Sequence, residues 1–141
     1  MQKFPFVAGL FIKDNQVLLS FRQNTGFLDG CYTLPGGKVE LGESLRAAMV
    51  REMHEELGVQ ISPDDISLAH ILSFKNEIGT ESVAVYFLIK KWQGELINKE
   101  PEKHAEIRWF PLDQLPENLS PRFHHGLTMI KKGILYSEYG W

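Results

Sequence analysis

GKVELGESLRAAMVREMHEELGV is the segment from Gly37 to Val59, and it decides the fold. Helix-forming residues fill its second half and Gly58 is a typical stop, so we predict a helix from Glu43 or Ser44 to Leu57. Three glutamates, Glu52, Glu55 and Glu56, have i, i+3 and i+4 spacing and share one helical face. Like charges at this spacing destabilise an exposed helix by roughly 0.2–0.5 kcal/mol per pair. A hard divalent cation with oxygen ligands would bring them together.

A Glu-rich helix face is usually solvated, but the helical phase favours a different interpretation here. Leu45, Ala48 and Met49 form an apolar stripe, and its continuation leads to the three glutamates. Carboxylates turned toward protein need basic partners or a metal. Because Arg51 alone does not neutralise three glutamates, we predict a cleft that binds a metal.

The size and composition of the chain limit the possible classes. Its 141 residues suit one α/β (α+β) domain over 1–141. The net charge of −3 argues against binding of duplex nucleic acid. Cys31 is the only cysteine, so we expect no internal disulfide and a reducing, cytoplasmic location. We also expect no signal peptide in Met1–Ile12 and no membrane span. A monomer or a homodimer is expected.

The rest of the chain alternates strand patterns with turns, which predicts a mixed β-sheet between helices. A strongly alternating pattern with apolar residues on both sides indicates that the strand over 82–92 is buried on both faces. Tyr136–Trp141 is expected to dock onto the domain. The predicted elements are strands over 4–12 and 17–21 as a hairpin, 31–34, 66–74, 82–92 and 106–110, a sharp turn at 35–37, a single helical turn over 111–116, and a helix from 120 or 121 to 132.

The segment quoted above resembles the Nudix box, G-x5-E-x7-R-E-U-x-E-E-x-G-U, in which U is a bulky apolar residue. Every specified position matches, and unbranched Met53 is the loosest fit. The resemblance implies a Nudix-like mixed sheet sandwiched between helices. It also implies a hydrolase that uses Mg²⁺ or Mn²⁺ to cleave nucleoside diphosphate-linked small molecules.

The same resemblance implies roles for individual residues. Glu52, Glu55, Glu56 and the Gly37 carbonyl would be metal ligands. Glu43 and Arg51 would mainly hold the loop and the helix together. An additional loop glutamate is expected near the metal; Glu100, Glu102 and Glu106 are the candidates, and Glu102 is preferred. The general base on the attacking water is left open between a box glutamate and this loop glutamate.

Contacts to the substrate are less well indicated by the sequence. Lys38 is either a phosphate contact or a solvated lysine. The aromatic residues that could stack on a nucleobase, although each is more typical of a core, are Phe27, Tyr32, Phe74 and Trp92. Trp109 and Phe110 are assigned to packing, and a ligand role for His124 and His125 is not favoured.

We predict a MutT-like (d)NTP pyrophosphohydrolase that releases a nucleoside monophosphate and pyrophosphate. An ADP-ribose, nucleotide-sugar or dinucleoside polyphosphate hydrolase is the alternative. Family members of that type tend to carry a proline or tyrosine beyond the box, and the corresponding region Ser73–Asn76 has neither. A non-catalytic nucleotide-binding Nudix domain is a third possibility, which the complete set of box carboxylates disfavours.

Overall fold

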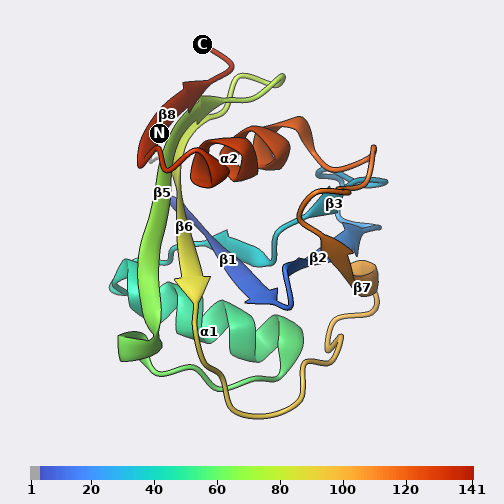
Figure 1. Ribbon diagram of the computed structural model, residues 1–141. Coiled ribbons are helices and arrows are strands. Elements are labelled where there is room, and N and C mark those ends of the chain that lie inside the picture. Colours follow the sequence, from blue (N-terminus) through green and yellow to red (C-terminus); the bar gives the residue numbers. More distant parts are fainter. Residues whose placement is uncertain (1–3) are drawn as a thin grey trace.

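The computed structural model describes residues 4–141, so the first three residues of the Met1–Ile12 segment lie outside it. A mixed eight-stranded sheet carries two α-helices, α1 and α2, on opposite faces (Figure 1). This architecture confirms the predicted mixed sheet between helices. The elements are β1 Phe6–Lys13, β2 Gln16–Arg22, β3 Tyr32–Thr33, β4 Gly36–Lys38, α1 Leu45–Leu57, η1 Pro63–Asp65, β5 Ile66–Lys75, β6 Glu81–Ile89, β7 His104–Pro111, α2 Pro121–Lys131 and β8 Tyr136–Tyr139.

The strand order is β3-β2-β1-β6-β5-β8, with β4 paired to β1 and β7 paired to β2. β1 runs parallel to β6, from Phe6 opposite Ala84 to Phe11 opposite Ile89. β1 and β2 form the predicted hairpin, whose two turn residues Asp14 and Asn15 both have positive φ, as a tight I′-type turn requires. β2 then diverges from β1 and pairs with β3 and β7.

The central strand β6 separates two hydrophobic cores. Val85 and Phe87 pack in the core beneath α1, whereas Ala84 and Tyr86 pack in the core beneath α2. Successive side chains of a strand point to opposite faces, so both faces of β6 are buried. This confirms the prediction from its apolar pattern, although the strand ends at Ile89, before Lys90–Trp92.

Helix α1 begins and ends as the sequence predicts. The Ser44 hydroxyl oxygen accepts a hydrogen bond from the Ala47 amide at 3.1 Å, which caps the N-terminus. Gly58 has φ of 72° and its N–H donates to the His54 carbonyl at 3.1 Å. Met49 and Met53 are fully buried, but Leu45 is 37% exposed. The buried face therefore starts one turn later than the predicted stripe.

One local prediction is wrong and another holds only in part. The chain bends at Pro35 as predicted, but the two glycines do not belong to the turn, because Gly36–Lys38 forms β4 and pairs with Phe6–Ala8. A Cβ on Gly36 would overlap the Val7 carbonyl oxygen, so a glycine allows the two backbones to approach. The segment 111–116 forms a turn closed by the hydrogen bond from Gln114 N–H to the Pro111 carbonyl at 3.0 Å, and no helix is present there.

The C-terminal segment docks onto the domain as predicted. β8 runs parallel to β5 over Ile71 to Phe74, and the Trp141 indole N–H donates to the Ser73 carbonyl at 3.1 Å. His125 contributes to this docking, because its ring contacts Tyr139 and the Ser137 hydroxyl. Within residues 4–141, neither helix is long and apolar enough to cross a membrane.

Candidate active site

A pocket of about 570 Å³ collects side chains from both helices and from the loop before β7. β4 and α1 contribute its acidic part, which includes Glu52, Glu55 and Glu56. Helix α2 contributes Arg122 and Phe123. The other lining residues used below are Phe6, Arg22, Phe27, Gly36, Gly37, Lys38, Phe74, Asn76, Ile78, Glu100, Lys103 and His104.

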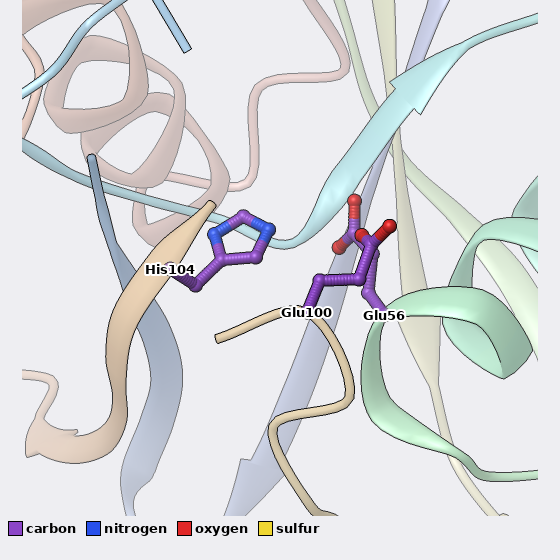
Figure 2. Close-up of side chains that lie close together, drawn as sticks. All are labelled: Glu56, Glu100 and His104. Atoms are coloured by element: carbon purple, nitrogen blue, oxygen red, sulfur yellow. The ribbon is translucent and has the colours of Figure 1, made fainter. Parts of the chain in front are cut away.

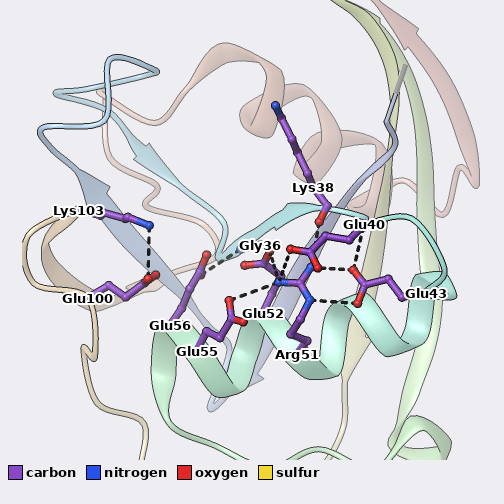
Figure 3. Close-up of polar contacts among 10 residues, drawn as sticks. All are labelled: Gly36, Lys38, Glu40, Glu43, Arg51, Glu52, Glu55, Glu56, Glu100 and Lys103. Atoms are coloured by element: carbon purple, nitrogen blue, oxygen red, sulfur yellow. Dashed lines mark hydrogen bonds and ion pairs between the residues drawn. The ribbon is translucent and has the colours of Figure 1, made fainter. Parts of the chain in front are cut away.

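Arg51 is the centre of the polar network on α1 (Figure 3). Its guanidinium donates two hydrogen bonds to the Glu43 carboxylate, at 3.0 Å from Nε and 2.7 Å from Nη2. It also donates to Glu52 at 3.0 Å, to Glu55 at 3.3 Å and to the Lys38 carbonyl at 3.1 Å. The hydrogen bonds from Arg51 lower the pKa of Glu43 to about 2, so this carboxylate stays ionised and holds the loop against the helix.

Glu56 lies outside this network. Its side chain is buried, with 6% of the residue exposed, and the Gly36 amide donates to it at 3.2 Å. Burial raises its pKa well above the ordinary value, and the charges of Glu52 and Glu100 raise it further. Burial likewise raises the pKa of Glu52, against the effect of Arg51. Two adjacent carboxyls are thus held where ionisation is unfavourable without an added cation.

The three box glutamates do not all face inward. Glu56 is buried and the Glu52 side chain is 14% exposed, but the Glu55 side chain is 51% exposed at the rim of the pocket. The reason is helical phase: Glu52 and Glu56 lie about 40° apart around the helix axis, whereas Glu55 lies about 100° from Glu56. The predicted inward orientation therefore holds for two of the three.

The loop before β7 brings the Glu100 carboxylate to Glu56, and the first residue of β7, His104, adds an imidazole (Figure 2). Glu56, Glu100 and His104 each offer a ligand atom, and these atoms lie within 4.8 Å of one another. Burial, with the nearby charges of Arg22 and Lys103, lowers the pKa of His104 to about 4. The imidazole is consequently neutral at physiological pH and one ring nitrogen is available as a ligand or acceptor.

These residues fit a divalent cation. Glu56 is a buried carboxylate with no cationic hydrogen-bond or ion-pair partner among residues 4–141, and Glu52 and Glu100 add negative charge beside it. Carboxylate oxygens suit Mg²⁺ and Mn²⁺, and an imidazole nitrogen is compatible with Mn²⁺ more than with Mg²⁺. Glu56, Glu100 and His104 are the residues whose ligand atoms come together, Glu52 lies beside Gly37, and Glu55 lies at the rim.

The three candidate loop glutamates have different environments in the structure. Glu100 is half-buried and lines the pocket, with Lys103 Nζ at 3.5 Å from its carboxylate. The preferred candidate of the sequence analysis, Glu102, is exposed and does not line the pocket. Glu106 instead accepts a hydrogen bond from the Tyr32 hydroxyl. Sequence reasoning could not choose among them, because the choice depends on how the loop turns.

Two of the four aromatic candidates reach the pocket. Phe27 and Phe74 line it, whereas Tyr32 packs between Phe21 and Phe110, and Trp92 packs edge-on against Phe11 at 5.1 Å. Three further pocket residues are not indicated by the sequence: Arg22, His104 and Arg122. Nothing in the local sequence distinguishes them from surface or core residues, since their burial follows only from the tertiary fold.

The NUDIX domain family model matches residues 3–128, and the chain therefore belongs to the Nudix family of phosphoanhydride hydrolases. It is a MutT-like member: a MutT NUDIX hydrolase from Burkholderia pseudomallei superposes with a TM-score of 0.82 at 30% identity, covering 91% of this chain and 98% of that one. Family members generally need a divalent metal, in agreement with the acidic pocket.

Curated relatives differ in their named activities. An ADP-ribose pyrophosphatase from Methanocaldococcus jannaschii is 37% identical over 79% of this chain, but the match spans only 63% of that protein. An 8-oxo-dGTP diphosphatase from Escherichia coli is 31% identical over 71% of this chain and 76% of its own length. The relatives thus establish the family and leave the substrate open.

We expect Gly37→Ala to weaken metal binding. The added Cβ would lie 2.6 Å from Cδ of Glu52 and would displace this carboxylate. Mn²⁺ affinity, measured by calorimetry, should fall by about 10-fold or more, as when the support of a metal ligand is lost. Arg46→Ala is the control, because it changes an exposed side chain of α1 that does not line the pocket. Equal Mn²⁺ affinity in Gly37→Ala and wild type would contradict the placement of Glu52.

We expect Glu56→Gln to stabilise the metal-free protein. Folding raises the pKa of Glu56, so the folded state binds this proton more tightly and loses stability as pH rises above 4.5 toward the raised pKa. The gain in the free energy of unfolding should be absent at low pH and should grow toward neutral pH. Each 1 kcal/mol of this gain raises Tm by about 2–5 °C. Thermal unfolding in EDTA across this pH range measures it. Exposed Glu102→Gln should show no such pH-dependent gain, and a flat difference for Glu56→Gln would refute the assignment.

Proposed function

We propose that the protein hydrolyses nucleoside diphosphate-linked compounds in a metal-dependent reaction, as a (d)NTP pyrophosphohydrolase that releases a nucleoside monophosphate and pyrophosphate. The observation that carries the proposal is a single pocket that contains both Glu56 beside Glu100 and a cationic, aromatic region on α2. The first part suits a metal-bound polyphosphate, and the second suits a planar base. The complete set of box carboxylates supports catalysis over passive binding.

In the proposed reaction, the metal ion and the protein side chains have different roles. Glu52, Glu56 and the Gly37 carbonyl would hold Mg²⁺ or Mn²⁺, with Glu55 at the rim and the Glu100 carboxylate left free to act on the water. When bound, the ion neutralises the phosphate oxygens and increases the acidity of the attacking water. Arg51 holds Glu52 and Glu55 in position through its hydrogen bonds. Preorganised ligands of this kind need little rearrangement during the reaction.

Other residues of the pocket would act on the substrate directly. Lys38, Lys103 and Arg22 line it and carry positive charge toward the phosphates. Glu100 comes from the loop instead of the helix, and we propose that its carboxylate accepts the proton of the water as oxygen attacks phosphorus. The bond to the leaving phosphate oxygen then breaks, and the two phosphate products separate. Glu100 is preferred over Glu102 because only Glu100 lines the pocket.

An ADP-ribose pyrophosphatase is the second candidate function. The 37% identity to the M. jannaschii protein of that name supports it. The two candidates share the bond chemistry and differ in products: ADP-ribose would give AMP and ribose 5-phosphate, without free pyrophosphate. Chromatography of the products therefore separates them.

We expect the purified protein to release pyrophosphate from at least one (d)NTP in the presence of Mg²⁺ or Mn²⁺. A panel of canonical (d)NTPs, 8-oxo-dGTP, ADP-ribose and nucleotide sugars should be tested. Glu56→Gln should reduce kcat/KM by about 100-fold or more, because the buried carboxylate is the proposed metal ligand. Circular dichroism would verify that this variant folds. Absence of turnover on the whole panel with both ions would overturn the proposed activity.

We expect Glu100→Gln to reduce kcat by about 100-fold or more, within the range that a general base contributes. Glu102→Gln is the matched control on the same loop, and it should retain nearly the wild-type kcat because its side chain is exposed outside the pocket. A larger loss in Glu102→Gln than in Glu100→Gln would show that Glu102 is the functional loop carboxylate.

A further inference from the structure

The strand β8 forms one edge of the sheet (Figure 1). Its inner side pairs with β5, where the Ile71 N–H donates to the Leu135 carbonyl at 2.8 Å. Backbone groups alternate in direction along a strand, so the N–H and C=O groups of Tyr136 and Glu138 point away from β5. No strand within residues 4–141 lies beyond β8 to pair with them. This outer edge of β8 is therefore open to another chain.

The other edge strands of the sheet are protected from pairing. In β3, the outward Tyr32 N–H donates to the Asn118 carbonyl at 2.9 Å and the Tyr32 carbonyl accepts from the Ser120 amide. In β4, the outward Lys38 carbonyl accepts from Arg51. β7 carries a glutamate and an arginine and ends at a proline, which are residue types that discourage edge pairing. β8 has no proline and a single charged residue.

Apolar side chains beside the open edge are exposed to solvent. Ile134, Leu135 and Tyr136 are consecutive in the sequence and are 40%, 54% and 52% exposed. Trp141, at the other end of the strand, is also exposed, although its indole N–H is hydrogen-bonded to Ser73. Single exposed apolar residues are common on protein surfaces. Four of them around one open strand edge are typical of a site of interaction with another chain.

We infer that β8 is an interface at which two copies of the chain pair antiparallel across a two-fold axis, so that two sheets become one. The inference is independent of the proposed function. A strand that pairs with its own copy in this way must be self-complementary. Two registers bring the outward backbone groups of both strands together. In one, Glu138 faces Glu138 of the partner subunit, and in the other it faces Tyr136 of the partner subunit.

The charge of Glu138 selects between these registers. Two glutamates directly opposite each other would destabilise the sheet. In the other register, the Tyr136 hydroxyl can donate to Glu138 of the partner subunit, as it donates to Glu138 of its own chain at 2.7 Å. The outward N–H and C=O groups of Tyr136 and Glu138 are then all satisfied across the axis. The strand is therefore self-complementary in this register.

The same register also covers apolar surface. Leu135 comes opposite Tyr139 of the partner subunit, an aliphatic and aromatic pair of the kind that stabilises neighbouring strands. An interface built on one short strand pair is nevertheless small, and small interfaces belong to weak, reversible complexes. The dimer is therefore expected to form at high protein concentration and to dissociate on dilution.

Sedimentation velocity tests the interface, in EDTA so that no bound metal bridges two copies. The wild-type protein should dimerise reversibly as its concentration rises from about 10 µM to about 1 mM. Glu138→Pro should raise the dimer Kd by about 10-fold or more, because each copy loses an outward N–H. The pairing with β5 should survive, since proline is tolerated where an edge N–H faces solvent. Glu138→Gln is the matched control: it keeps this N–H and an acceptor for Tyr136, and it should dimerise like the wild type.

Two substitutions of Tyr136 test the register. Tyr136→Lys and Tyr136→Glu lose the same ring and differ in charge. The lysine would face Glu138 of the partner subunit, whereas the glutamate would be repelled by it. At low salt the dimer Kd should be about 5-fold or more lower for Tyr136→Lys than for Tyr136→Glu. The difference should shrink at high salt, because exposed charges are screened.

Three results would overturn the inference. A wild-type protein that stays monomeric up to about 1 mM would leave the edge to a strand of a different protein. A Glu138→Pro variant that dimerises as tightly as the wild type would show that the copies associate elsewhere. Equal Kd values for the two Tyr136 variants at low salt would refute the register. Thermal unfolding verifies that each variant keeps its fold, and the Tyr136 pair decides the question if Glu138→Pro does not.

Discussion

The site depends on Arg51, because its single guanidinium donates hydrogen bonds to three carboxylates. Its guanidinium binds the Glu43 carboxylate through two hydrogen bonds and also donates to Glu52, Glu55 and the Lys38 carbonyl. It thereby fixes the loop from β4 onto helix α1 and offsets part of the repulsion along the helix. Every hydrogen-bonding direction of this cation is used, so none is left for Glu56. Burial therefore keeps ionisation of Glu56 unfavourable within the described chain, and a bound cation would offset this cost.

The fold maintains this unfavourable arrangement through packing on both sides of the sheet. Met49 and Met53 bury one face of α1 completely, and the helix is capped at both ends. Glu56 lies on the same helix and is buried together with those residues. The close pairing of β4 with β1 then places the Gly36 amide against its carboxylate. Because the core stabilises the helix independently, the local cost at Glu56 is tolerated until a cation removes it.

Sequence reasoning identified the helix, its end at Gly58 and the acidic face, since these depend on local spacing and capping. It was less successful where the outcome depends on rotation or on distant segments. Glu55 belongs to the same motif as Glu56, yet a difference in helical phase leaves it exposed. The sequence indicates the bend at Pro35 but not the strand β4, because the pairing of β4 with Phe6–Ala8 is not visible in the glycine pair itself. Glu100 and Glu102 are two residues apart in one acidic loop, and only the turn of that loop separates them.

Arg122 is another pocket residue whose burial could not be predicted from the sequence. Arginine in the first turn of an amphipathic helix is normally solvated, and only the approach of Phe6 and Phe74 from β1 and β5 buries it. The pocket thus contains, on α1, a buried carboxyl whose ionisation is unfavourable and, on α2, a buried guanidinium that receives no hydrogen bond from residues 4–141. A ligand that satisfies both must be negatively charged with a bound cation at one part and rich in hydrogen-bond acceptors at another. A metal-bound nucleotide, the substrate proposed above, has this distribution of charge and acceptors.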